Sequence, residues 1–143
     1  MSDAQRLAET VVAGMLRHDQ FSRWLGLEVT ALSPGNCTCR MTVRPEMVNG
    51  FGFAHGGIAF SLADSALAFA SNSGGKVNVS IDNAISYPAA IHRGDELTAV
   101  AVEERRTRRL GFYRVTVTNQ GGETVALFRG TVFQTEKDHR THA

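Results

Sequence analysis

Cysteine is scarce in this chain of 143 residues. The two cysteines, Cys37 and Cys39, lie two positions apart and would close only a strained ring, so we expect reduced thiols on one side of a strand and no disulfide framework. A hydrophobic fraction of 43% together with a small net charge excludes a chain that is mainly disordered. The length suffices for one domain with a hydrophobic core.

Neither sign of charge is in excess. Fifteen Lys and Arg against fourteen Asp and Glu give a net charge of +1, so nothing in the overall charge favours nucleic acid as a partner. The N-terminus lacks a secretory pattern, and the longest apolar stretch, 58–70, is interrupted by polar residues and too short to cross a bilayer. We therefore expect a cytoplasmic protein that binds neither nucleic acid nor membranes.

The apolar periodicity predicts two helices and six strands. Residues 3–18 repeat apolar side chains at three- and four-residue steps, and the Ala- and Leu-rich segment 58–72 is typical of a buried helix. The strands are expected over about 27–31, 37–43, 77–87, 96–104, 111–119 and 124–133. This order indicates an α+β fold with an antiparallel sheet wrapped around the second helix, followed by a polar, frayed tail over 135–143.

The second helix carries a single ionisable side chain, Asp64. It lies on one stripe of small and polar groups with Ser61, Ser65 and Ala68, whereas the rest of the helix surface is apolar. Burying a carboxylate without a cation is costly, and no Lys or Arg lies on this helix to pair with it. Asp64 is therefore either a structural acceptor of hydrogen bonds from a neighbouring loop, or a general base whose pKa desolvation raises.

Two glycines, Gly56 and Gly57, open the same helix, where backbone N–H groups lack partners within the helix. A ligand oxygen can approach such amides closely, and the helix dipole favours a developing negative charge there. The pattern is typical of an oxyanion hole, and equally of a turn or a close-packing position. Gly56 and Asp64 are about 12 Å apart along a helix, so both can act on one carbonyl only if a second copy of the chain supplies one of them.

The motif Asn49-Gly50, His55-Gly56-Gly57 and Asp64-Ser65-Ala66 resembles the signature of hotdog-fold acyl-CoA thioesterases. The resemblance is closest to the phenylacetate-degradation type, the phenylacetyl-CoA thioesterases. It covers about residues 20–133 and continues through the segments 85–88, 94–95, 111–113 and 125–130.

This resemblance implies a single hotdog domain over 1–134, with an antiparallel sheet around a long central helix and an extra helix at the N-terminus. It also implies hydrolysis of acyl-CoA, with an aromatic, phenylacetyl-type acyl group, by a dimer that commonly doubles into a homotetramer. In such an enzyme Asp64 would activate the attacking water or act as the nucleophile. The Gly56 amide would polarise the thioester carbonyl, and Asn49 would position the water or the substrate.

Three further residues each have a functional and a purely structural interpretation. His55 either hydrogen-bonds near the thioester carbonyl or only caps the helix. Ser80 either helps to hold the water or is an ordinary strand serine. Gly57 is expected beside the substrate, although a Gly-Gly pair alone is a weak signal.

Four arginines lie within five positions between two predicted strands. Of these, Arg108 and Arg109 are expected to bind the phosphates of coenzyme A, because guanidinium groups suit phosphate in charge and geometry. A solvated hairpin tip would have the same composition. Candidate walls of an apolar acyl pocket are Met47, Phe51 and Phe53.

We expect no metal and no prosthetic cofactor, with coenzyme A present only as part of the substrate and product. His139 and His142 have the spacing of a ligand pair, but they lie in the polar tail without further ligands. Two other functions remain possible on the same fold. One is a hydratase or dehydratase of acyl-CoA or acyl carrier protein, with His55 and Asp64 transferring protons; the other is a non-enzymatic acyl-CoA-binding sensor.

Overall fold

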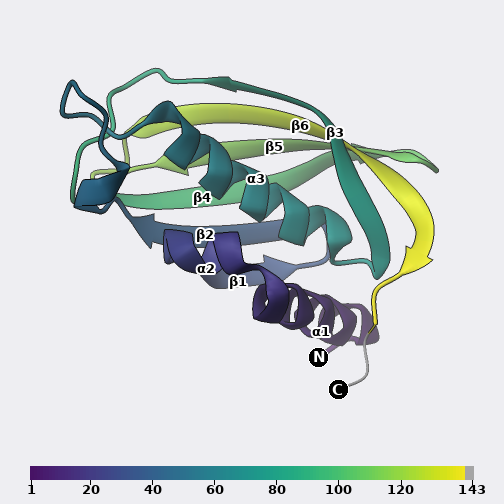
Figure 1. Ribbon diagram of the computed structural model, residues 1–143. Helices are drawn as coiled ribbons and strands as arrows, with labels where there is room; N and C mark the ends of the chain where they lie inside the picture. Colours follow the sequence, from purple (N-terminus) through teal and green to yellow (C-terminus); the bar gives the residue numbers. More distant parts are fainter. Residues whose placement is uncertain (141–143) are drawn as a thin grey trace.

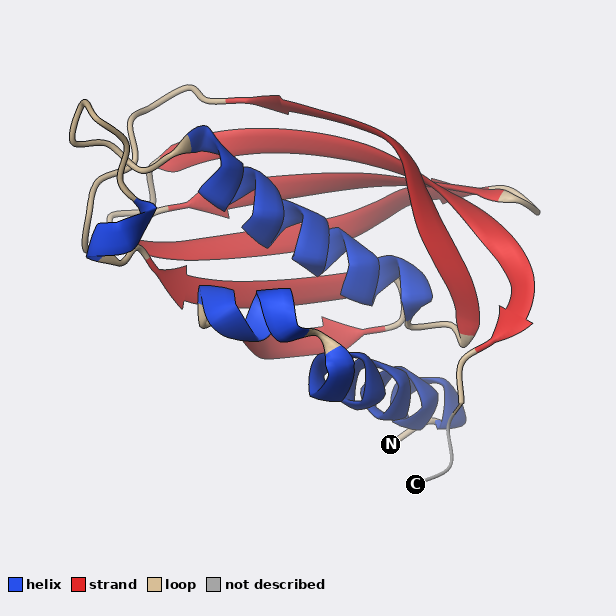
Figure 2. Cartoon of the chain, viewed as in Figure 1, coloured by secondary structure: helices blue, strands red, loops and turns tan. Residues whose placement is uncertain are grey.

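The computed structural model describes residues 1–140, which form one curved sheet with the helices on a single face (Figures 1 and 2). The helices are α1 (Asp3–His18), α2 (Gln20–Leu25), the short 3-10 helix η1 (Pro45–Met47) and α3 (Gly56–Asn72). The strands are β1 (Glu28–Ser33), β2 (Asn36–Thr42), β3 (Lys76–Ser86), β4 (Glu96–Arg106), β5 (Leu110–Thr118) and β6 (Thr124–Asp138). The predicted α+β architecture is confirmed.

The sheet has the order β1-β2-β4-β5-β6-β3, and all neighbouring strands are antiparallel. β2 and β3 follow one another in the chain but lie near opposite edges of the sheet. The helix α3, which connects them, must therefore cross the concave face, as Figure 1 shows. This crossing places the two ends of α3 at opposite ends of the strands.

The contact between α3 and the sheet forms the core. Along α3 eight apolar residues are buried, most of them small or aliphatic: Ile58, Ala59, Leu62, Ala63, Ala66, Leu67, Phe69 and Ala70. On β6, Gly130 leaves room for the helix, because a Cβ atom there would overlap the Leu67 methyl group and lie 2.7 Å from the Asn83 Oδ1 atom. A glycine in mid-strand is thus explained by close approach of the helix.

A second helix that the sequence pattern does not predict, α2, fixes the surroundings of α3. The Asp19 carboxylate caps α2 by accepting the Ser22 backbone N–H at 2.9 Å, and the Ser22 hydroxyl lies 2.8 Å from the Ser65 hydroxyl on α3. Six residues of helix are too few to show a clear apolar period. The first helix, α1, is capped by Ser2, whose hydroxyl accepts the Gln5 backbone N–H.

The expected fraying from residue 135 onwards is wrong for residues 135–138, which continue β6. β3 is long enough to pair with them, and the Thr135 hydroxyl donates to the Val77 carbonyl oxygen at 2.7 Å. His139 then reaches the Asn72 Oδ1 atom at 2.7 Å. The rest of the expected tail, residues 141–143 with His142, lies outside the described residues.

The two cysteines are buried on β2 and are free thiols with their sulfur atoms 3.8 Å apart, as the spacing predicts. Among the described residues, no helix has the length and apolar character that crossing a membrane requires.

We expect Gly130→Ala to destabilise the protein by about 1–3 kcal/mol, because the new methyl group overfills the contact between α3 and β6. Urea denaturation checks this. Gly121→Ala is the matched control: its Cβ would meet nothing closer than 3.5 Å, so its midpoint should stay near that of the wild type. Equal midpoints for both variants would show that the helix does not need this close approach.

Candidate active site

The N-terminus of α3 is built from His55, Gly56 and Gly57. His55 is the N-cap, and its Nδ1 atom accepts the Gly57 backbone N–H at 2.9 Å. A ring nitrogen that accepts a hydrogen bond carries no proton, so the neutral imidazole holds its proton on Nε2. The expected capping role of His55 is therefore present in the structure, and it leaves a second ring nitrogen as a donor.

Both glycines are explained by close contacts, because neither has a positive φ. A Cβ atom at position 57 would lie 3.0 Å from the His55 Nδ1 atom, and one at position 56 would lie 3.1 Å from the Tyr87 hydroxyl oxygen. The Tyr87 hydroxyl donates to the Gly56 carbonyl oxygen at 2.6 Å. Any larger residue would push one of these side chains away from the helix end.

The amide N–H of Gly56 makes no hydrogen bond within residues 1–140. It is the first N–H of α3, so the helix itself offers it no acceptor. The N–H of Gly57, in contrast, donates to the His55 Nδ1 atom. Of the two amides considered from the sequence, Gly56 is the one with a donor available to a ligand.

Asn49 organises the loop that leads into the helix. Its Oδ1 atom accepts the backbone N–H groups of Phe51 at 2.9 Å and Phe53 at 3.2 Å, and its own N–H donates to the Phe53 carbonyl oxygen. The side-chain NH2 makes no hydrogen bond in the described part of the chain. Asn49 is thus both a loop residue, as an Asn-Gly pair suggests, and a possible donor to a ligand.

Asp64 is half-buried in the middle of α3. Within residues 1–140 its carboxylate has neither a hydrogen bond nor an ion pair, so the structural alternative of a loop donor is not what this chain provides. Its neighbours on the stripe are engaged elsewhere: the Ser61 hydroxyl donates to the Gly57 carbonyl oxygen, and Ser65 contacts Ser22. Burial raises the pKa of the Asp64 carboxyl above its usual value.

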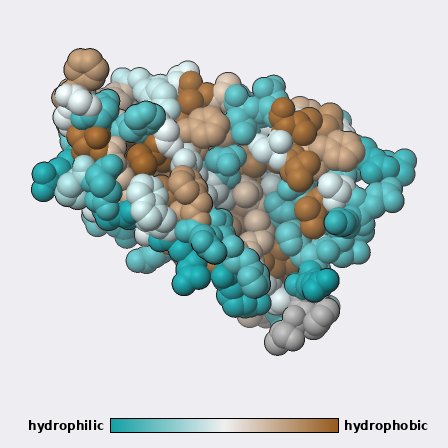
Figure 3. Space-filling view, in the orientation of Figure 1, coloured by the Kyte–Doolittle hydropathy of each residue, from teal (hydrophilic) through white to brown (hydrophobic). Residues whose placement is uncertain are grey.

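A groove of about 360 Å³ lies beside the glycines. It is lined by Phe53, Ala54, Gly56, Tyr87, Pro88, Ala89, Ala90 and Ile91. Of the three expected pocket walls, only Phe53 lines it. Phe51 is 87% exposed at the loop tip, where Figure 3 shows apolar surface, and Met47 is wrongly assigned because it is buried in the core.

The expected coenzyme A contacts lie far from the glycines of the same chain. Arg108 and Arg109 form the tip of the β4–β5 hairpin, at the end of the sheet where α3 finishes (Figure 1). Arg109 is held there by an ion pair with Glu136 at 3.1 Å. Ser80 lies on the edge strand β3, where its hydroxyl donates to the Asn83 Oδ1 atom at 3.0 Å.

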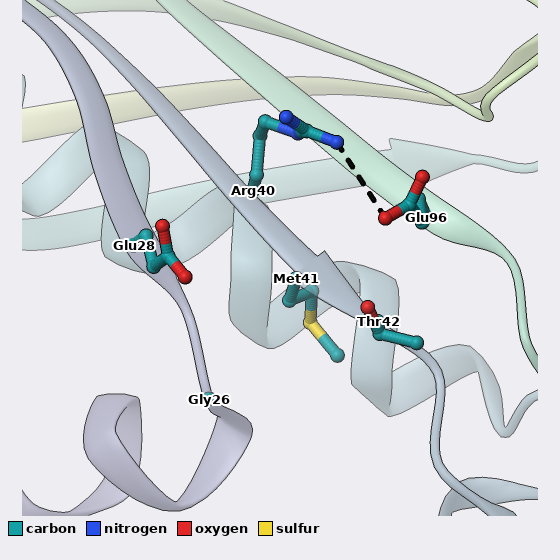
Figure 4. A pocket seen from close by; sticks show the side chains of 6 residues that line it. All are labelled: Gly26, Glu28, Arg40, Met41, Thr42 and Glu96. Atoms are coloured by element: carbon teal, nitrogen blue, oxygen red, sulfur yellow. Dashed lines mark ion pairs between the residues drawn. The ribbon is translucent and has the colours of Figure 1, made fainter.

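A second groove lies away from all of these residues, on the sheet beside β1. Figure 4 shows its lining by Gly26, Glu28, Arg40, Met41, Thr42 and Glu96. Arg40 and Glu96 form an ion pair at 3.6 Å, and the carboxylate of Glu28 is exposed. Among residues 1–140 no three His, Cys, Asp or Glu side chains gather in a way that could hold a metal ion.

Comparison with known proteins agrees with this architecture. Residues 51–126 match the model of the thioesterase superfamily. The acyl-coenzyme A thioesterase PaaI of Escherichia coli (strain K12) is 37% identical over 88% of this chain and 86% of its own length. Human acyl-coenzyme A thioesterase 13 is 31% identical over 91% of this chain and 95% of its own.

Solved structures match over most of the chain. The PaaI protein from the phenylacetic acid degradation operon of E. coli has a TM-score of 0.93 at 33% identity, covering 95% of this chain and 99% of that one. The protein smu.793 of Streptococcus mutans UA159, bound to acetyl CoA, has a TM-score of 0.75 at 30% identity, covering 80% and 90%. The fold is thus that of the hotdog thioesterases. The chain belongs to the thioesterase superfamily, which confirms the resemblance seen in its motifs.

Tyr87 is not among the residues that the sequence selects, although it contacts the first residue of α3. Its contact with Gly56 joins positions 31 residues apart. A contact between residues so far apart leaves no local period or spacing in the sequence. The one available signal is the tyrosine and proline at 87–88, where a predicted strand ends.

We expect Asp64→Asn to raise the stability of the protein at pH 7. A carboxyl whose pKa is higher in the folded state than in the unfolded state destabilises the folded state once it is ionised. The cost is therefore present above the folded pKa and vanishes below the unfolded value near 3.8.

Urea denaturation at fixed protein concentration, at pH 7 and near pH 4, checks this expectation. The advantage of Asp64→Asn should be larger at pH 7. Asp82→Asn, on exposed β3, removes the same charge and should show no such advantage. Identical midpoints of wild type and Asp64→Asn at both pH values would mean that burial does not penalise this carboxylate.

Proposed function

We propose that the chain hydrolyses acyl-CoA thioesters to a free acid and coenzyme A, with aromatic, phenylacetyl-type acyl groups as its preferred substrates. The observation that carries the proposal is the pairing, on one helix, of an unpartnered Gly56 amide with an unpartnered, half-buried Asp64 carboxylate. The acyl-CoA class is supported by the thioesterases of E. coli and human named above and by the acetyl CoA bound to the S. mutans protein. The aromatic acyl group is supported by the operon of the E. coli structure.

Asp64 acts as the general base in this proposal. Its carboxylate takes a proton from water, and the hydroxide oxygen bonds to the thioester carbon while the carbonyl electrons move to oxygen. The Gly56 N–H donates to that oxyanion, with the dipole of α3 adding favourable potential. Collapse reforms the carbonyl, the C–S bond breaks with its electron pair going to sulfur, and the thiolate takes the proton from Asp64.

Other residues support this reaction. Asn49 has a free side-chain NH2 with which to position the water or substrate, and the Nε2–H of His55 is the donor that it can offer to the thioester carbonyl. The chemistry uses no metal and no prosthetic group, and coenzyme A takes part only as half of the substrate. Direct attack by Asp64 is the second route: its carboxylate oxygen bonds to the thioester carbon, the C–S bond breaks, and the thiolate leaves a mixed anhydride. Water that hydrolyses this anhydride at the Asp64 carbon would leave 18O label in the Asp64 carboxylate after a single turnover.

The site is shared between two copies of the chain. Gly56 and Asp64 are eight positions apart on α3, about 12 Å along the helix, and a single carbonyl cannot contact both. In a two-fold dimer with antiparallel α3 helices, Asp64 of one copy faces Gly56 of the other. The same geometry brings the hairpin with Arg108 and Arg109 from the far end of one protomer toward the glycines of its partner, and two such dimers form the proposed homotetramer.

We expect wild-type protein to release free thiol from acyl-CoA substrates, and Asp64→Asn to lower kcat by about 10²–10⁴-fold because the general base is lost. A panel of phenylacetyl-, benzoyl-, acetyl- and hexanoyl-CoA ranks the acyl groups, with phenylacetyl-CoA expected to have the highest kcat/KM. Asp82→Asn should keep wild-type turnover. Loss of enoyl-CoA absorbance without thiol release would indicate the hydratase instead, and binding without any turnover would indicate the sensor.

We expect mixed dimers to recover activity from two inactive variants. Gly56→Pro removes the donor N–H at the first helical position, where proline is tolerated and where His55 already has a compatible ψ of 135°. Asp64→Ala removes the base. Each mixed dimer holds one intact site, so an equal mixture should regain about a quarter of wild-type activity.

Gly56→Ala is the matched control for this experiment, because it adds the same Cβ atom as proline but keeps the N–H. It should retain more activity than Gly56→Pro. If mixed dimers form, as mass spectrometry would show, and no activity returns, the shared site is wrong.

A further inference from the structure

Tyr87 comes directly after β3 and lies over the first residue of α3. Its hydroxyl donates to the Gly56 carbonyl oxygen at 2.6 Å, and its ring passes so close that a Cβ atom on Gly56 would lie 3.3 Å from the tyrosine Cζ atom. Burial raises the pKa of the Tyr87 hydroxyl, so it keeps its proton and remains a donor at neutral pH. Tyr87 thus touches the backbone of the proposed oxyanion site without a role in the chemistry described above.

The carbonyl that Tyr87 contacts belongs to the same peptide unit as the Gly57 N–H. That N–H donates to the His55 Nδ1 atom at 2.9 Å. The Gly56–Gly57 peptide is therefore held on both sides, by Tyr87 at its oxygen and by His55 at its nitrogen. Hydrogen bonds in such a chain polarise and strengthen one another, so the tyrosine hydroxyl also supports the orientation of the imidazole ring.

Two consecutive glycines need such a restraint. A Cβ atom at position 56 or 57 would crowd Tyr87 or His55, which favours glycine at both, and glycine is the residue with the greatest backbone freedom. The first turn of a helix is also where backbone N–H groups lack acceptors within the helix. The Gly56 N–H belongs to the preceding His55–Gly56 peptide, whose carbonyl oxygen accepts the Ile58 N–H at 2.9 Å, and the Tyr87 contact limits the rotation at Gly56 that joins the two peptides. An oxyanion donor is effective only when it is oriented before the reaction.

We propose that Tyr87 is a positioning residue, whose hydroxyl holds the Gly56–Gly57 peptide and thereby aims the Gly56 amide and the His55 ring at the thioester carbonyl. The inference rests on the proposed thioesterase reaction. It assigns the hydroxyl to positioning and separates it from the ring, which lines the groove with Phe53 and Pro88. Removal of the hydroxyl should therefore affect turnover, whereas removal of the ring should also affect substrate binding.

The test compares Tyr87→Phe, which keeps the ring, with Tyr87→Leu, which does not. Ser86→Ala removes a hydroxyl from the neighbouring, exposed position and is the control. For Tyr87→Phe we expect kcat to fall about tenfold or more with KM within about twofold of wild type, and KM to rise in Tyr87→Leu. Ser86→Ala should behave as wild type in both parameters.

A second readout does not depend on activity. In 15N-labelled protein, hydrogen exchange of the Gly57 amide should be faster in Tyr87→Phe than in wild type and Ser86→Ala, while the urea midpoint stays near the wild-type value. Unchanged kcat, or a defect confined to KM, would overturn the positioning role. If the wild type hydrolyses no thioester, the proposed function fails, and Gly57 exchange still decides whether Tyr87 restrains the peptide: equal exchange in Tyr87→Phe and wild type would refute it.

Discussion

The close packing of α3 on the concave face of the sheet is the contact on which the rest of the structure depends. Alanines on the helix and Gly130 on β6 bring the two within direct contact, so α3 has little freedom to shift or rotate. The two residues at the centre of the proposed chemistry derive their positions from that helix. Gly56 is its first residue, Asp64 lies on its outer stripe, and Ser65 joins it to α2.

The sequence predicts the fold well wherever the signal is local. The change of apolar period from 3.6 to 2 along the chain marks α1, α3 and all six strands, because burial on one face imposes that period. The six residues of α2 are too short to show it. The continuation of β6 to Asp138 depends on pairing with β3, more than 50 positions earlier, which a polar sequence alone does not disclose.

The candidate site is predictable in its chemistry and less so in its geometry. A lone carboxylate on an apolar helix and glycines at the helix start can be recognised from residue types and spacing. Tyr87 cannot, since its role arises from a contact between distant segments. The separation of Arg109 from Gly56 cannot be recognised either, because it follows from the direction in which β4 crosses the sheet. Residues placed by topology are thus the ones that sequence reasoning misses.

The reactivity of the two buried thiols of β2 reports how often this strand separates from α3. Cys37 and Cys39 are 2% and 0% exposed in the core that includes α3, and the hydrogen bond with the Cys37 thiol, together with burial, raises the pKa of Cys39 far above its usual range. A thiol reagent therefore reaches them only when β2 opens away from the helix. The rate of labelling measures how often that happens, and native enzyme adds almost no background when the thiol of coenzyme A is being counted.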